Sequence, residues 1–140
     1  MNEAAGGPSA RRLADAQYVL LTTFRKDGTP VPTPVWAAGL DDGRLGVWTV
    51  TDSGKVKRIR RSGAVEVAEC DRRGRPLGPA VPATAELLDA EGTRRVRRAV
   101  ARKYGLVGRI AVGSSRLFRG DRGSTGLAVA VGGSPPPPTR

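Results

Sequence analysis

Short runs of β-branched and aliphatic residues recur along the chain and predict β-strands. Successive side chains of a strand point to opposite faces, so a half-buried strand alternates apolar and polar residues. This alternation is clearest where Val65 and Val67 flank Glu66. Strands are expected at residues 18–24, 29–37, 44–51, 64–70 and 81–87, with a last strand at 127–131. Turns containing Asp and Gly, at residues 27–28, 41–43 and 71–74, separate consecutive strands. Strands joined mainly by hairpins favour an antiparallel barrel or sandwich.

The strand expected at residues 29–37 contains three prolines, Pro30, Pro32 and Pro34. Proline has no N–H group to donate to a neighbouring strand, so it is confined to edge strands or to positions without a partner. This strand should therefore lie at the edge of the sheet, or leave one of its sides unpaired.

One long helix is expected from Asp89, which can cap it, to about Tyr104, with Gly105 ending it. Val96, Val100 and Tyr104 form its apolar stripe. Arginines cover its remaining faces, namely Arg94, Arg95, Arg97, Arg98 and Arg102. Such a charge run usually forms a solvated face, and anion binding is the alternative interpretation.

Two shorter helices are expected, one at about residues 9–16 and one that starts after Gly54 and ends at Gly63 as its C-cap. The small, polar residues 1–8 and the Pro-rich residues 132–140 are expected to be disordered. Residues 9–131 should then form a single domain.

The stretch from Trp48 to Arg61 combines the end of a strand, a turn and the start of the basic helix. It supplies hydroxyls and cations close to a helix N-terminus, where free N–H groups favour anions. The residues concerned are Thr49, Thr51, Ser53, Lys55 and Arg58. They suit a phosphate group. Equally, Ser53 could merely cap the helix while the cations stay in solvent.

Composition narrows the possible chemistry. The chain has no histidine, which excludes Ser-His and Cys-His nucleophile pairs and histidine-ligated metal sites. No residue is assigned a catalytic role, and an enzyme with these residues would take its reactivity from a cofactor. The single cysteine, Cys70, has no internal disulfide partner and is expected to be structural. With no apolar run long enough for a membrane span and no signal sequence, a cytoplasmic protein is expected.

The formal net charge of +11 raises the possibility of a nucleic-acid-binding module. Aromatic residues make up only 4% of the chain, which is too few for a platform on which bases stack. The positive charge therefore favours anionic small molecules, or keeps the surface solvated.

Several short motifs occur in an order that resembles a known family. They are Leu21-Thr22-Thr23-Phe24-Arg25, Pro32-Thr33-Pro34-Val35-Trp36, the stretch 48–58, Cys70-Asp71-Arg72-Arg73-Gly74 and Lys103-Tyr104-Gly105. Together they resemble the split β-barrel flavin and deazaflavin oxidoreductases related to pyridoxamine 5′-phosphate oxidase, above all the actinobacterial PPOX-class F420-dependent branch. The likeness covers roughly residues 13–108. It implies a mainly β fold, an FMN-binding type of split β-barrel with about six antiparallel strands, Greek-key closure and one long helix.

The resemblance also implies a function. It predicts an oxidoreductase that uses coenzyme F420 to transfer a hydride to or from an electron-poor small molecule, in a homodimer with the cofactor at the subunit interface. Thr49, Thr51, Ser53, Lys55 and Arg58 match positions that hold the cofactor phosphate, and Thr33, Pro34, Val35 and Trp36 match the strand along the ring. Trp48 is expected in the core or the dimer interface. The alternatives are an FMN-dependent enzyme and a non-catalytic protein that binds a flavin, haem or another tetrapyrrole.

Overall fold

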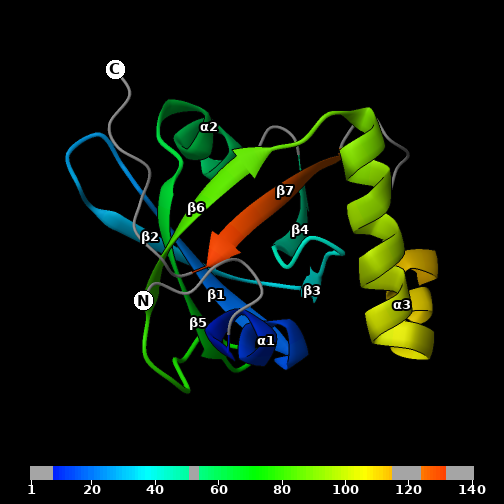
Figure 1. The fold of residues 1–140 in the computed structure, drawn as a ribbon. Coiled ribbons are helices and arrows are strands. Elements are labelled where there is room, and N and C mark those ends of the chain that lie inside the picture. The colour runs from blue at the N-terminus through cyan, green and yellow to red at the C-terminus, as the bar shows by residue number, and fades with distance from the viewer. Residues whose placement is uncertain (1–7, 51–53, 115–123, 132–140) are drawn as a thin grey trace.

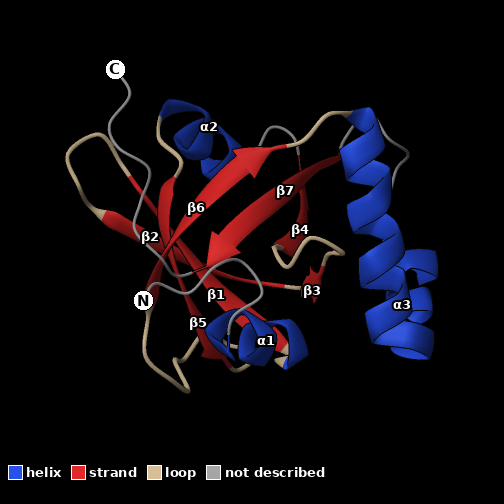
Figure 2. Ribbon diagram, viewed as in Figure 1, coloured by secondary structure: helices blue, strands red, loops and turns tan. Residues whose placement is uncertain are grey.

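The computed structural model describes residues 8–50, 54–114 and 124–131. Seven strands and three helices follow one another along these residues (Figures 1 and 2). In order they are α1 (Pro8–Asp15), β1 (Tyr18–Phe24), β2 (Pro30–Val35), β3 (Ala37–Gly39), β4 (Leu45–Val50), α2 (Gly54–Arg61), β5 (Ala64–Cys70), β6 (Val81–Leu87), α3 (Ala90–Ser114) and β7 (Ser124–Val131).

All seven strands form one antiparallel sheet in the order β2-β1-β5-β6-β7-β4-β3. The strands at the two ends of this order, β2 and β3, are joined by the single residue Trp36. The sheet must therefore curl until its ends meet, and Figure 1 shows the resulting half-open barrel. Sequence neighbours are not always sheet neighbours, as Greek-key closure requires. The expected split β-barrel with few helices is confirmed.

The proline-rich strand is at the edge of the sheet, as predicted, but it is shorter than expected. The stretch 29–37 forms β2 and the first residue of β3, because the chain leaves β1 at Val35 and joins β4 from Ala37 onward. In β2 the residues Pro32 and Pro34 are exposed, and Val31, Thr33 and Val35 are half-buried. The last strand, β7, starts at Ser124 instead of residue 127 and lies inside the sheet, between β6 and β4.

Two clusters of buried side chains make the core. The larger one fills the barrel with the inward-facing side chains of the strands, among them Leu21, Val67 and Leu127. The second cluster lies between the outside of the sheet and α3, where Val96 and Val100 are buried. Trp36, Trp48 and Tyr104 pack against this second cluster, so the expected apolar stripe of the long helix is confirmed, and half-buried Trp48 lies against the core, the first of the two places expected for it.

The helix ends agree with the sequence only in part. The Asp89 carboxylate accepts a hydrogen bond from the Gly92 amide at 2.8 Å, so Asp89 caps α3 as predicted. Gly105 interrupts α3 with φ of 54°, and a second helical stretch follows it to Ser114. Gly63 does not have a positive φ, so the predicted C-cap is wrong. A Cβ at Gly63 would lie 2.7 Å from the carbonyl oxygen of Ala85, and the close approach of β6 explains this glycine.

α1 and α2 lie at opposite ends of the barrel, while α3 covers one side of it (Figure 1). α2 closes its end with the buried side chains of Val56 and Ile59. None of the helices that the structure describes has the length and apolar character of a membrane span.

Candidate functional site

The β4–α2 junction, residues 49–58, is the candidate phosphate site. Thr49 is half-buried near the end of β4, and Lys55 and Arg58 lie on the first turns of α2. Residues three apart on a helix share a face, so the two cations are neighbours. Thr51 and Ser53 lie outside the described residues.

Arg58 is held in place by a buried hydroxyl of the barrel. Its Nε donates a hydrogen bond to Oγ1 of Thr23 at 2.6 Å, and Thr23 is 1% exposed at the end of β1. The guanidinium folds back along the helix and lies over Gly54. A Cβ at Gly54 would be only 2.8 Å from the Nη1 atom of Arg58. Gly54 therefore leaves room for this arrangement. The guanidinium stays at the N-terminal end of α2, where an anion would also meet the helix N–H groups.

Lys55 is half-buried, and this burial lowers the pKa of its ammonium group, with the neighbouring Arg58 as the second cause. Among the residues that the structure describes, neither cation has a carboxylate within 4.0 Å. α2 has no acidic residue in its first turn. Two adjacent positive charges therefore lie together at a helix N-terminus, and a phosphate would offset their repulsion. This donor set suits a phosphate group.

The proline-rich edge strand begins beside this cation pair. Thr23, the partner of Arg58, lies opposite Val31 of β2, and Thr33 follows two residues along the same face. Within the described chain, β2 pairs with β1 alone, so no described strand pairs with its outer edge. Arg58 thus lies at the end of the barrel where β2 begins, and residues 33–35 run along the same edge toward the other end, where Val35 pairs with Val19.

Trp36 is placed differently from its neighbours in the predicted set. Its ring stacks on the ring of Tyr104, with centroids 4.3 Å apart and planes 11° from parallel. One face of Trp36 is therefore occupied by its own chain, and only the other face or the backbone is left for a cofactor.

Lys103 and Tyr104 hold the chain by hydrogen bonds where it crosses from β2 to β3 at Trp36, and these contacts are called the latch. The sequence did not predict them. The Lys103 ammonium donates to the carbonyl oxygens of Ala16 and Ala37, each at 2.6 Å. The Tyr104 hydroxyl donates to the carbonyl oxygen of Gln17 at 2.9 Å. Burial lowers the pKa of Lys103 and raises that of Tyr104. The motif Lys103-Tyr104-Gly105 was the sequence signal, but these contacts join residues far apart in the chain.

Cys70 is buried, and burial, followed by the charges of Asp71 and Glu69, raises the pKa of its thiol. A raised thiol pKa leaves little reactive thiolate at neutral pH, which suits a structural residue.

Comparison with known proteins gives a family and a set of similar folds. The sequence model of the family described as "Pyridoxamine 5′-phosphate oxidase" matches residues 9–121, more than half of the chain. No curated protein matches the sequence.

Solved structures share the fold at low sequence identity. The conserved hypothetical protein Rv2991 from Mycobacterium tuberculosis has a TM-score of 0.61 and 20% identity, over 88% of this chain and 78% of that one. The haem storage protein HutZ from Vibrio cholerae has a TM-score of 0.64 and 10% identity, over 92% of both chains. A structure described as an F420 reductase has a TM-score of 0.54 and 19% identity, over 86% of this chain and 91% of that one.

Proposed function

Because the chain belongs to the pyridoxamine 5′-phosphate oxidase family, we propose that it is an oxidoreductase that binds coenzyme F420 and transfers a hydride to or from an electron-poor small molecule. The observation that carries this proposal is the Lys55 and Arg58 pair, which has no carboxylate partner among the described residues and lies beside β2, an edge strand that pairs with β1 alone among those residues. That combination offers an anion site next to a backbone edge.

Within the proposed site, Lys55 and Arg58 bind the phosphate together with Thr49, and Thr51 and Ser53 supply two further hydroxyls. Thr33, Pro34, Val35 and Trp36 lie along the ring. The exposed prolines of β2 suit this role, since they prevent another strand from pairing with the same edge. Bound there, the deazaflavin would donate or accept a hydride at a ring carbon. The chain would orient the ring and exclude water.

A second copy of the chain is proposed to complete the pocket. Among the described residues, β2 has a neighbouring strand on one side only, and a second chain could cover the other side. Size-exclusion chromatography with light scattering should give twice the mass of 14.7 kDa. A monomer that nevertheless binds the cofactor tightly would contradict the shared pocket.

FMN is the second candidate cofactor, because its phosphate and ring place the same demands on the site. Haem is less suited, because the chain has no histidine to bind its iron. The sequence resemblance to the F420-dependent branch, together with the F420 reductase of similar fold, favours the deazaflavin.

Parallel titration separates these candidates. Protein from a host that lacks the deazaflavin should be purified colourless and should quench the fluorescence of added F420. Protein purified yellow, with FMN bound more tightly than F420, would overturn the choice of F420 and leave the flavin alternative. Tight DNA binding with a steep salt dependence and no response to either cofactor would contradict both.

A further inference from the structure

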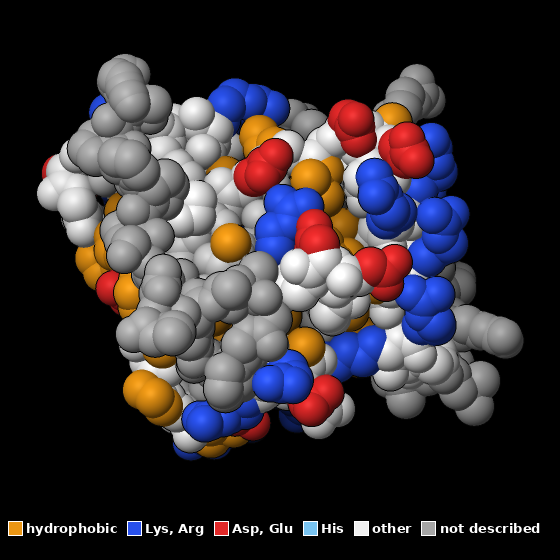
Figure 3. Space-filling view, viewed as in Figure 1, with side chains coloured by type: hydrophobic (Ala, Val, Ile, Leu, Met, Phe, Trp, Pro, Cys, Tyr) orange, Lys and Arg blue, Asp and Glu red, His pale blue; other side chains and the backbone are white. Residues whose placement is uncertain are grey.

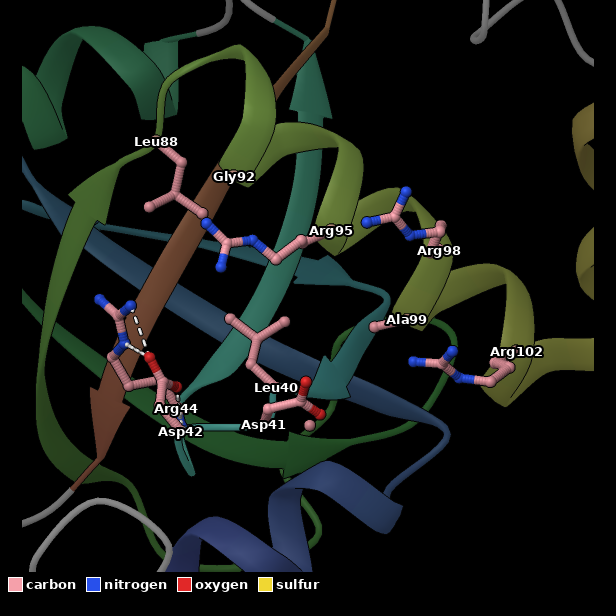
Figure 4. Close-up of a pocket in the computed structure, with 11 residues that line it drawn as sticks. Leu40, Asp41, Asp42, Arg44, Leu88, Gly92, Arg95, Arg98, Ala99 and Arg102 are labelled. Carbon is pink, nitrogen blue, oxygen red and sulfur yellow. Dashed lines mark hydrogen bonds and ion pairs between the residues drawn. The ribbon is translucent and has the colours of Figure 1, made fainter.

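A cleft of about 270 Å³ lies between α3 and the turn that joins β3 to β4. Apolar side chains from both sides line it, namely Leu40, Leu88 and Ala99. Charged side chains surround them, and Figure 4 shows how they approach from the helix and from the turn. None of the lining residues belongs to the β4–α2 junction. The cleft is therefore separate from the proposed phosphate site.

Three arginines of α3 line one side of this cleft. Arg95, Arg98 and Arg102 are spaced by three and four residues, so they project from successive turns of one helix face, as Figure 4 shows. Over these seven residues the helix rises about 10 Å. All three are exposed, and Figure 3 shows Lys and Arg side chains gathered along the α3 side of the molecule.

The charges around the cleft do not balance. On the side of the β3–β4 turn, Arg44 forms ion pairs with Asp42 at 2.7 Å and with Glu86 at 3.2 Å, which satisfies that arginine. Asp41 is the other acidic residue of the lining. Within the described part of the chain, none of the three α3 arginines has a carboxylate within 4.0 Å. The residues that line the cleft thus include four arginines and two aspartates, and the like charges of the three α3 arginines repel each other.

We propose that this cleft binds a small anion that carries at least two phosphate or carboxylate groups. The planar guanidinium fork pairs with both kinds of group in a bidentate manner. Guanidinium groups spread along two turns of helix select an extended anion over a single small ion. Leu40, Leu88 and Ala99 provide a surface for a carbon skeleton between the charged groups. The site needs neither the family's cofactor nor a second chain.

Calorimetric titration at low ionic strength tests the proposal with two probes, inorganic triphosphate and citrate. The tighter probe identifies phosphate or carboxylate as the preferred group. The double variant Arg95→Ala/Arg98→Ala should weaken binding at least about tenfold, which is the loss of a strong ionic contact. The matched control, Arg72→Ala/Arg73→Ala, removes the same charge from the exposed β5–β6 turn and should change affinity less than about twofold.

A third variant separates this cleft from the β4–α2 junction. In Lys55→Ala the binding event that depends on Arg95 and Arg98 should persist at unchanged affinity. Binding of neither probe to the natural chain would overturn the proposal. Equal losses of affinity in the two double variants would also overturn it, because they would indicate a diffuse effect of charge. A loss of affinity in Lys55→Ala alone would overturn it too, because it would assign the anion to the β4–α2 junction. Circular dichroism should confirm that all variants keep the fold.

Discussion

Thr23→Val tests whether Arg58 is anchored on the barrel. Valine has nearly the shape of threonine, so the substitution leaves the core volume unchanged while it removes the oxygen that accepts the Arg58 Nε hydrogen bond at 2.6 Å. Because Thr23 is 1% exposed, water cannot readily replace the lost acceptor. Two effects follow: the folded state loses stability, and the guanidinium loses its fixed position.

The expected magnitude comes from the charge of the donor. A hydrogen bond to a charged group contributes about 1.5–3 kcal/mol. For a domain of this length, that loss lowers the melting temperature by about 5–12 °C. A double-mutant cycle with Arg58→Ala should recover most of the same free energy as the coupling between the two residues. Cofactor affinity should fall in Thr23→Val, but less than in Arg58→Ala, because the charge remains.

Urea denaturation and a cofactor titration measure both effects. The control is Thr22→Val, the neighbouring half-buried threonine on the opposite face of β1, which should change stability by less than about 0.5 kcal/mol. Equal stability of Thr23→Val and the natural chain, or a coupling energy near zero, would refute the anchoring of Arg58 by Thr23.

Three further substitutions test other parts of the account. Cofactor affinity should fall as the pH rises toward 10.5, because Lys55, with its lowered pKa, loses its proton at a lower pH than an ordinary lysine. In a series of titrations at different pH values, Lys55→Arg should abolish this fall. Gly126→Ala would place a Cβ 2.9 Å from the Cα of Thr93 and should cost about 1–3 kcal/mol in denaturant unfolding, whereas Gly78→Ala meets no atom within 4 Å and should be nearly neutral. Tyr104→Phe removes a hydroxyl bonded to a backbone carbonyl and should cost about 1 kcal/mol; an unchanged stability would contradict the latch.

The local features of the fold follow from the sequence because their causes are local. Gly28, Gly43 and Gly74 have φ near +90°, as expected for glycines in hairpin turns. The prolines of β2 required an edge, and the sheet gives them one. These predictions needed only the backbone chemistry of single residues.

The features that sequence reasoning missed depend on long-range contacts. Nothing in the run 29–37 marks Trp36 as the crossing between the two ends of the sheet, since that depends on which strands β2 and β3 pair with. The Arg58 contact with Thr23 spans 35 residues, and that of Lys103 with Ala16 spans 87. The sequence predicted which side chains could bind a phosphate, but not what holds them.

Phosphate discrimination tests the central claim most directly. Two matched pairs of compounds are used. FMN and riboflavin share the flavin ring and differ in the phosphate, and F420 and its phosphate-free chromophore share the deazaflavin ring. In the pair that the natural chain binds more tightly, it should prefer the phosphorylated compound over the phosphate-free one by at least about tenfold. Lys55→Ala should lose most of that preference. Equal affinity for both members, or a preference that Lys55→Ala leaves intact, would show that the β4–α2 junction does not hold the phosphate.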